Sequence, residues 1–254
     1  MNKIKVLFIG NSQFSGGDLT RTIQTISESA PAESPRIEPT NALIGGKGLR
    51  GYWEAGDGPG TPRALITAGG WDNVVIQEIF CAGEAEFEDY AARFDVAIRT
   101  SGARTILFAT ANTTEFYSPG YKYPDSFVKL NGMQVAFGKK RGIAVAAAGY
   151  AWMAYLGANP TVEQRLDLYA PDKGHPGVKG SWIYAYLLYA VITGRNPEPL
   201  PLPAGGVDAG QGVIIAKDEL VRMRTAAWKQ VAPGASSGTH RKKAISRQHS
   251  PQTS

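Results

Sequence analysis

Residues 5–12 read KVLFIGNS, a short run of apolar and β-branched residues that ends in a glycine and is followed by a serine. A run of this length and composition predicts a buried β-strand, and Gly10 predicts its end. Four similar runs follow, with helix-like stretches between them, at 37–44, 73–77, 105–109 and 142–147. Strands that alternate with helices predict a parallel sheet covered by helices on both faces. The expected fold class is therefore α/β, in a three-layer α/β/α arrangement with a parallel sheet of about five strands.

Amphipathic stretches separate these strands. Leu19, Ile23 and Ile26 recur at the spacing of one helix face, and residues 87–98 carry a longer apolar stripe. Further helices are expected over about 125–141, from near Tyr150, over about 177–193 and over 214–231. Residues 45–63 hold many glycines and predict a long loop.

The body and the end of the chain differ in composition. Residues 1–232 are expected to form a single domain. Residues 233–254 are polar, contain four basic residues and no acidic one, and predict a disordered basic tail. The chain carries a net charge of +5, and this tail accounts for +4 of it. A nearly neutral body does not predict nucleic-acid binding.

Cysteine usage and apolar patterning bear on location and cofactors. The single cysteine, Cys81, excludes an internal disulfide. No signal peptide is visible before the first strand, and the longest apolar stretch, Ile183–Thr193, is too short to span a bilayer. We therefore expect a cytoplasmic protein with no membrane span, and the oligomeric state stays open. One histidine in the body and no cysteine cluster predict no metal site, and no cofactor is expected.

A serine and a histidine occupy informative positions. Ser12 directly follows the first strand, and parallel sheets bind ligands at the carboxyl ends of their strands. Residues 172–175 read DKGH, and His175 is the only histidine outside the tail. Serine needs a neighbouring base to act as a nucleophile; His175 can be that base, and Asp172 can orient it. Taken singly, each residue also has a structural interpretation, Ser12 as a helix cap and His175 as a loop residue.

Three groups are candidates to stabilise negative charge on an attacked carbonyl oxygen. They are the backbone N–H of Ser12, the backbone N–H of Gly46 and the side-chain amide of Gln77. In the alternative interpretation, Gly46 only forms a tight turn and Gln77 only hydrogen-bonds at the end of its strand. Cys81 also follows a strand end and is an alternative nucleophile, but no motif surrounds it.

Three blocks of the chain resemble the SGNH (GDSL-type) hydrolases, in particular a subgroup whose first block reads Gly-Asn-Ser. Residues 6–12, VLFIGNS, resemble the first block, and residues 41–46, NALIGG, resemble the second. Residues 172–176, DKGHP, resemble the last block. The resemblance covers roughly residues 4–231 and implies a flavodoxin-like SGNH-hydrolase fold. It also implies Ser12 as the nucleophile, Asp172 and His175 as the other members of a triad, and Gly46 as an oxyanion donor.

The third block departs from the family pattern. The family usually has Gly-x-Asn-Asp there, whose Asn is an oxyanion donor, whereas residues 75–78 of this chain read VIQE. Gln77 carries the same amide on a longer arm, and we expect it to replace that Asn. We expect Glu78 to be a surface charge rather than a partner of the site.

The resemblance implies a serine hydrolase that cleaves a small-molecule ester through an acyl-enzyme. A short acyl group, such as an O-acetyl group on carbohydrate, fits the family. Trp53 from the glycine-rich segment, together with Phe116 and Tyr117 from an aromatic loop, is expected to wall the pocket.

The alternative is a non-catalytic doubly wound protein that binds a phosphorylated or nucleotide ligand at the 11–19 loop, before a helix N-terminus. That segment matches neither G-x-x-x-x-G-K-[ST] nor G-x-G-x-x-G. This alternative also leaves Asp172 and His175 without a role.

Overall fold

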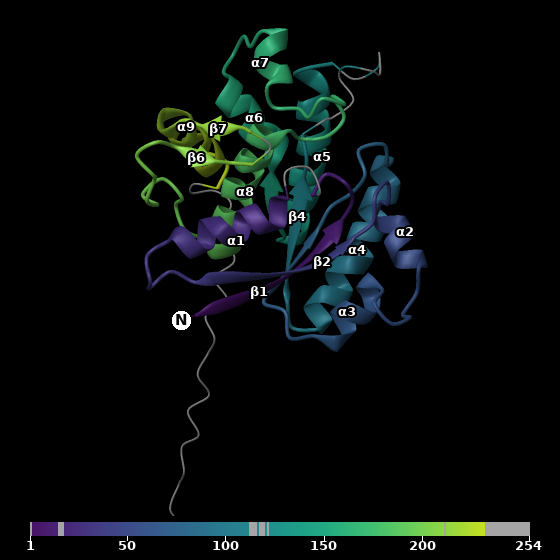
Figure 1. Cartoon of the computed structure of the whole chain (residues 1–254). Coiled ribbons are helices and arrows are strands. Elements are labelled where there is room, and N and C mark those ends of the chain that lie inside the picture. Colours follow the sequence, from purple (N-terminus) through teal and green to yellow (C-terminus); the bar gives the residue numbers. More distant parts are fainter. Residues whose placement is uncertain are drawn as a thin grey trace, which may run out of the picture.

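A five-stranded parallel sheet forms the centre of the computed structural model, which describes residues 2–14, 18–111, 116, 120, 122–210 and 212–231 (Figure 1). The strands lie in the order β2-β1-β3-β4-β5, and every neighbouring pair is parallel. Their bounds are β1 Lys3–Gly10, β2 Arg36–Leu43, β3 Asn73–Ile76, β4 Arg104–Ala109 and β5 Ala144–Ala147. The predicted fold class, an α/β arrangement with a parallel sheet of about five strands, is confirmed.

Alternation along β1 divides the core into two layers. Val6 and Phe8 belong to one apolar cluster, and Leu7 and Ile9 belong to the other, because successive side chains of a strand point to opposite faces. All four side chains are fully buried, as expected for a central strand of a parallel sheet. Helices α1 (Leu19–Ser29) and α8 (Val178–Thr193) contribute to the first cluster.

The remaining helices complete these two layers. Helix α6 (Ala148–Leu156) and α9 (Lys217–Trp228) pack with α8, and each contributes to the first cluster. Figure 1 shows α2 (Leu49–Glu54), α3 (Pro62–Ala68) and α4 (Glu84–Thr100) together on the opposite face of the sheet. Helix α5 (Asp125–Arg141) contributes Phe127 to the first cluster and Phe137 to the second.

Helix α8 is the most deeply buried helix among those described. Every residue from Gly180 to Ile192 is buried, so the helix is apolar around its whole circumference rather than along one stripe. Gly180 packs against the ring of Trp152 and the carbonyl of Leu168, where a side chain would clash. The residues just before α8 are those of the 172–176 block, so this rigid helix anchors the loop that carries His175.

Some local predictions were wrong. Residues 45–63 do not form a continuous loop, because α2 occupies Leu49–Glu54 and α3 begins at Pro62. Leu49 and Tyr52 are buried there, whereas the glycines on either side of α2 gave the segment the composition of a loop. The last helix begins at Lys217 rather than near residue 214, since Ile214–Ile215 forms β7, which pairs with β6 (Val207–Asp208).

One helix was not predicted, and the structure does not test the proposed tail. The short helix α7 (Val162–Leu166) has no long apolar stripe, and a capping box formed by Thr161 and Gln164 begins it. The proposed tail, residues 233–254, lies outside the described residues, and so does residue 232. In the described part of the chain, no helix combines the length and apolar character needed to cross a bilayer.

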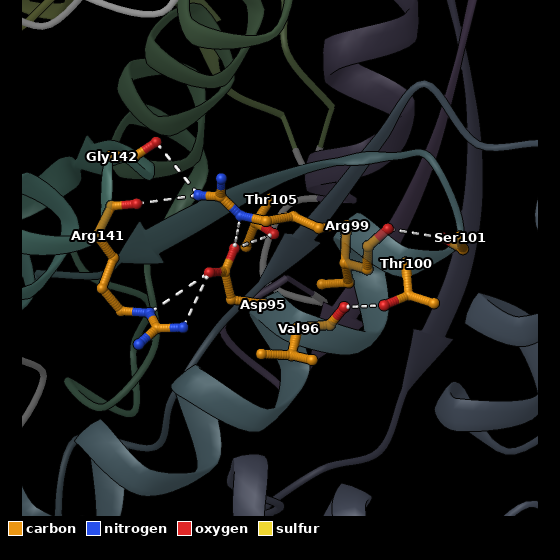
Figure 2. A network of polar contacts seen from close by, with 9 residues as sticks. Asp95, Val96, Arg99, Thr100, Ser101, Thr105, Arg141 and Gly142 are labelled. Atoms are coloured by element: carbon orange, nitrogen blue, oxygen red, sulfur yellow. Dashed lines mark hydrogen bonds and ion pairs between the residues drawn. The ribbon is translucent and has the colours of Figure 1, made fainter.

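The buried carboxylate of Asp95 links helices to the sheet at the edge opposite the strand carboxyl ends (Figure 2). Asp95 of α4 is 2% exposed and accepts hydrogen bonds from Arg99 Nε and Thr105 Oγ1, both at 2.8 Å. Arg141, at the end of α5, approaches the other carboxylate oxygen at 3.3 Å. These contacts join α4, β4 and α5 and satisfy the buried charge.

Candidate active site

The turn after β1 holds Ser12 at the carboxyl edge of the sheet. Phe14 N–H donates to the Asn11 carbonyl at 3.0 Å, which closes the turn, and Phe14 packs into the core against Phe8 and Phe108. The Asn11 side-chain oxygen accepts from the Gln13 N–H at 3.2 Å. The turn is therefore fixed on both sides of Ser12, whose side chain stays half-buried.

The 172–175 segment forms a second tight turn, which presents His175. One carboxylate oxygen of Asp172 accepts the backbone N–H groups of Gly174 (2.9 Å) and His175 (3.1 Å). Lys173 adopts a left-handed conformation with φ of 57°, and the Ala170 N–H donates to the His175 carbonyl at 2.9 Å. These local hydrogen bonds orient the Asp172 and His175 side chains independently of Ser12.

Ser12, His175 and Asp172 form one hydrogen-bonded chain. The second carboxylate oxygen of Asp172 lies 2.6 Å from His175 Nδ1, and His175 Nε2 lies 2.8 Å from Ser12 Oγ. An ionised carboxylate only accepts hydrogen bonds, so Nδ1 carries the proton and Nε2 accepts from the serine hydroxyl. The structure thus brings together three residues that are up to 163 positions apart in sequence.

The carboxylate end of this chain stays charged. The pKa of Asp172 lies below its ordinary value, chiefly because the Gly174 N–H donates to the carboxylate, with further contributions from the His175 side chain and N–H. Partial burial opposes these effects without overcoming them. Asp172 is therefore an anion at neutral pH, the state that holds an imidazole in the Nδ1–H tautomer.

Gln13 joins the two turns and was not predicted as a site residue. Its side-chain Nε2 donates to the Gly174 carbonyl at 3.2 Å, so the residue after the proposed nucleophile holds the residue before the proposed base. Gln13 is buried. A polar residue directly after Ser12 was the available signal, but nothing in the sequence indicated its partner.

Gly46 lies in the loop after β2, beside Ser12. It has a φ of +71°, which favours glycine, and it lines the same cavity as Ser12 and His175. The Asn11 side chain donates to the Lys47 carbonyl at 3.0 Å and so ties this loop to the Ser12 turn. Neither the Ser12 N–H nor the Gly46 N–H has a hydrogen-bond partner among the residues that the structure describes. Both residues line the cavity.

These loops line a small, partly open cavity of about 110 Å³. The residues that line it come from four strand ends and the histidine loop: Asn11, Ser12, Gln13, Gly46, Gln77, Ile79, Phe80, Thr110, Gly174 and His175. Ile79, Phe80 and Thr110 were not predicted. Their position directly after β3 and β4 was the signal that could have identified them, since strand carboxyl ends meet at one edge.

Gln77 lies at the predicted place and lines the cavity, and its amide also bonds the backbone. The side chain is 1% exposed; its oxygen accepts the Asn11 N–H at 2.9 Å, and its nitrogen donates to the Glu78 carbonyl. The reverse orientation of the amide would set donor against donor and acceptor against acceptor, so these partners fix it.

Glu78 is not the surface charge that we expected. Its side chain is buried, and one carboxylate oxygen accepts the N–H groups of Leu49 (3.0 Å) and Ile79 (2.7 Å). Burial raises the pKa of Glu78 to about 7, and the two N–H donors offset part of this effect while the Glu86 carboxylate adds to it.

The predicted aromatic walls lie elsewhere. Trp53 belongs to α2 and packs edge-on against Phe94 of α4 at 5.2 Å between ring centroids, with Arg63 stacked over its ring. Phe116 packs edge-on against Tyr169, also at 5.2 Å. Neither side chain lines the cavity, because each is drawn into an aromatic cluster. Tyr117 lies outside the described residues, and Cys81 is exposed and does not line the cavity.

A larger cavity of about 310 Å³ lies among α6, α7, α8 and α9, away from the triad residues. Three of its charged side chains are paired: Lys179 approaches Asp167 at 2.7 Å and Glu219 at 3.0 Å. None of the predicted site residues lines it. The smaller cavity, which contains the serine and the histidine, is therefore the candidate active site.

Comparison with known proteins bears on the fold. The sequence matches no protein-family model, and a search of curated proteins finds no match. Among solved structures, a candidate SGNH hydrolase from Slackia heliotrinireducens superposes with a TM-score of 0.60 at 20% identity, over 75% of this chain and 100% of that one. Axe2, an acetylxylan esterase from Geobacillus stearothermophilus, gives 0.56 at 15% identity, over 76% and 95%. TesA gives 0.53 at 14% identity, over 75% and 98%.

These likenesses cover most of the chain and nearly the whole of each matched structure. This chain has the SGNH-hydrolase fold. Its assignment to a subgroup with a Gly-Asn-Ser first block stays a prediction.

Proposed function

We propose that this protein is a serine hydrolase that cleaves a small-molecule ester through an acyl-enzyme. The observation that carries the proposal is the hydrogen-bonded chain from Asp172 through His175 to Ser12, at the carboxyl edge of the sheet. A serine hydroxyl that donates to an imidazole, itself oriented by a carboxylate, is the arrangement that activates a weak nucleophile.

In the first half of the proposed reaction, Ser12 Oγ attacks the ester carbonyl carbon while His175 Nε2 takes the hydroxyl proton. The tetrahedral intermediate collapses when the bond to the alcohol breaks, and His175 returns the proton to the leaving alkoxide. Asp172 stabilises the imidazolium and keeps its orientation. Water then repeats the sequence on the acyl-enzyme and releases the acid.

The negative charge on the carbonyl oxygen needs preset donors. We assign this role to the backbone N–H groups of Ser12 and Gly46, which have no partner among the described residues and border the cavity. The assignment of Gln77 as a third donor stays a prediction: its oxygen accepts the Asn11 N–H and one Nε2–H donates to the Glu78 carbonyl, which leaves the second Nε2–H for the oxyanion. In the proposal, Gln77 also holds the Asn11 N–H, next to Ser12.

The size of the cavity favours a short acyl group. A cavity of about 150 Å³ holds benzene, with its six heavy atoms, so the 110 Å³ beside Ser12 corresponds to roughly four heavy atoms. Ile79 and Phe80 supply apolar contacts for such a group. An O-acetyl group on carbohydrate is the finer proposal, supported by the likeness of the fold to an acetylxylan esterase.

A chain-length series tests this proposal. We expect hydrolysis of p-nitrophenyl acetate and butyrate, and a loss of kcat/KM of at least about tenfold for the octanoate, since its acyl chain exceeds the volume of the cavity beside Ser12. Acetylated xylo-oligosaccharides test the carbohydrate assignment. Equal rates for acetate and octanoate would contradict the short-acyl assignment, and a Ser12→Ala variant as fast as the parent would contradict the mechanism.

The non-catalytic alternative is not favoured. The expected ligand of the 11–19 loop is an anion, but Asp18 stands at the N-cap of α1, and its carboxylate opposes a bound phosphate. Residues 15–17 of that loop lie outside the described residues.

A further inference from the structure

Glu78 is a buried carboxylate that the proposed reaction does not use. Its side chain is 4% exposed, and no lysine or arginine pairs with it in the described part of the chain. One oxygen accepts the Leu49 and Ile79 N–H groups at 3.0 and 2.7 Å, and the other has no hydrogen-bond partner among the described residues. Burying a carboxylate with an unpartnered oxygen is unfavourable, so an uncharged residue would serve the packing of this position better.

The residue it holds, Leu49, ends the loop that carries Gly46. That loop runs from Ile44 to the start of α2 at Leu49. The Ile44 N–H approaches the Tyr52 hydroxyl of α2 at 2.6 Å, and three further hydrogen bonds attach the loop to the rest of the site. The Ile44 N–H donates to the Gly10 carbonyl at 3.1 Å, the Asn11 side chain donates to the Lys47 carbonyl, and the Leu49 N–H donates to Glu78. Gly46 lies between the first two attachments, and Glu78 fixes the far end.

Gly48 shows how closely the carboxylate approaches this loop. Its backbone is extended, so its φ does not require glycine. A side-chain carbon at this position would clash with the Glu78 carboxylate oxygen and lie 2.8 Å from Ile79 Cγ2. The absence of a side chain at position 48 therefore allows the contact between Glu78 and the first turn of α2.

We propose that Glu78 is a positioning residue, whose carboxylate fixes the loop between β2 and α2 so that the Gly46 N–H points at the oxyanion. This inference rests on the proposed function, because it assigns Glu78 to the oxyanion hole of that reaction. Its pKa, raised to about 7 by burial, is consistent with a site where stability is given up for function.

Two uncharged replacements separate the hydrogen bond from the charge. Glu78→Gln keeps an oxygen that accepts from Leu49 and Ile79, whereas Glu78→Met keeps the length of the side chain and removes the acceptor. With p-nitrophenyl acetate, we expect Glu78→Gln to keep kcat within about threefold of the parent. We expect Glu78→Met to lose about 100-fold in kcat with KM within about threefold, since a displaced oxyanion donor acts on the transition state.

Hydrogen exchange of the Leu49 amide is measured alongside activity, because it does not depend on catalysis. Faster exchange of the Leu49 amide in Glu78→Met, with exchange like that of the parent in Glu78→Gln, supports the positioning role of Glu78. Thr105→Val is the control for a general loss of stability, since it removes a hydrogen bond to Asp95 near the opposite end of the sheet.

The inference is overturned if Glu78→Met keeps kcat within about threefold, or if both variants lose activity equally. Ser12→Ala in the same assay separates this failure from failure of the proposed function. If Ser12→Ala is as fast as the parent, the reaction itself is wrongly assigned. If Ser12→Ala is inactive while Glu78→Met keeps its activity, the proposed reaction stands and the positioning role of Glu78 is refuted.

Discussion

Replacing Glu78 with glutamine is expected to change how stability depends on pH. The pKa of Glu78 is raised from 4.5 to about 7, mainly by burial. A carboxyl group whose pKa is raised on folding binds its proton more tightly in the folded state, so its contribution to stability is complete below about pH 4.5. That contribution is lost as the pH rises through about 7. The difference corresponds to about 3 kcal/mol, at about 1.4 kcal/mol per unit of pKa.

Urea unfolding of the parent and of Glu78→Gln at pH 5, 6, 7 and 8 measures this effect. The parent is expected to lose about 3 kcal/mol of unfolding free energy relative to the variant between pH 4.5 and 8, most of it between pH 5 and 7. Other titrating groups are common to both proteins and cancel in the difference. The glutamine amide adds only a constant, because it does not titrate. Parallel stability curves for the two proteins would refute the raised pKa and the burial that causes it.

Four further outcomes are expected. Asp172→Asn should lower kcat by about 10⁴-fold with an unchanged circular dichroism spectrum, because the imidazole loses the carboxylate that selects its tautomer. Gln77→Met should lower the urea-derived unfolding free energy by about 1–3 kcal/mol, since the Asn11 N–H and the Glu78 carbonyl lose buried partners. Thr105→Val should lower the same quantity by about 1–3 kcal/mol with unchanged esterase activity; a loss of activity would show that the Asp95 network reaches the site. Truncation after Val231 should leave activity and Tm unchanged, because the residues beyond it are polar and lack an apolar period.

The strands of the sheet follow from local patterns in the sequence. Val6–Ile9 is apolar on both faces, which only a covered central strand requires, and Gly10 marks the point where the backbone leaves the sheet. Helix α8 was predicted within a residue of its start because its apolar residues are continuous. In α2, by contrast, Leu49 and Tyr52 stand among glycines, and only burial against other elements makes that segment helical.

The candidate site could be predicted only in part, because some of its residues belong to short sequence motifs and others depend on contacts with residues far away in the sequence. Ser12 and the 172–175 turn belong to short motifs, so their positions follow from adjacent residues. How much of the Gln77 amide is left for a ligand depends on its contacts with Asn11 and Glu78, which the spacing of residues in the sequence does not determine. The same holds for Glu78, whose burial depends on a loop about 30 residues earlier in the chain.

The aromatic residues show a related limit. Trp53 and Phe116 were expected at the pocket because exposed rings suit ligands, but each has a nearby aromatic partner in the fold. An aromatic ring is stabilised by edge-on packing against another ring as well as by contact with a ligand. Composition cannot distinguish these two outcomes, because both use the same residue types.

Covalent labelling of Ser12 tests the central claim most directly. The protein is treated with a fluorophosphonate in increasing amounts, and peptide mass spectrometry is run in parallel with p-nitrophenyl acetate hydrolysis. The account predicts that one equivalent of phosphonyl group is bound, that it lies on Ser12, and that activity falls in proportion to labelling. Activity that survives complete modification of Ser12, or a stoichiometric label on a different residue, would contradict it.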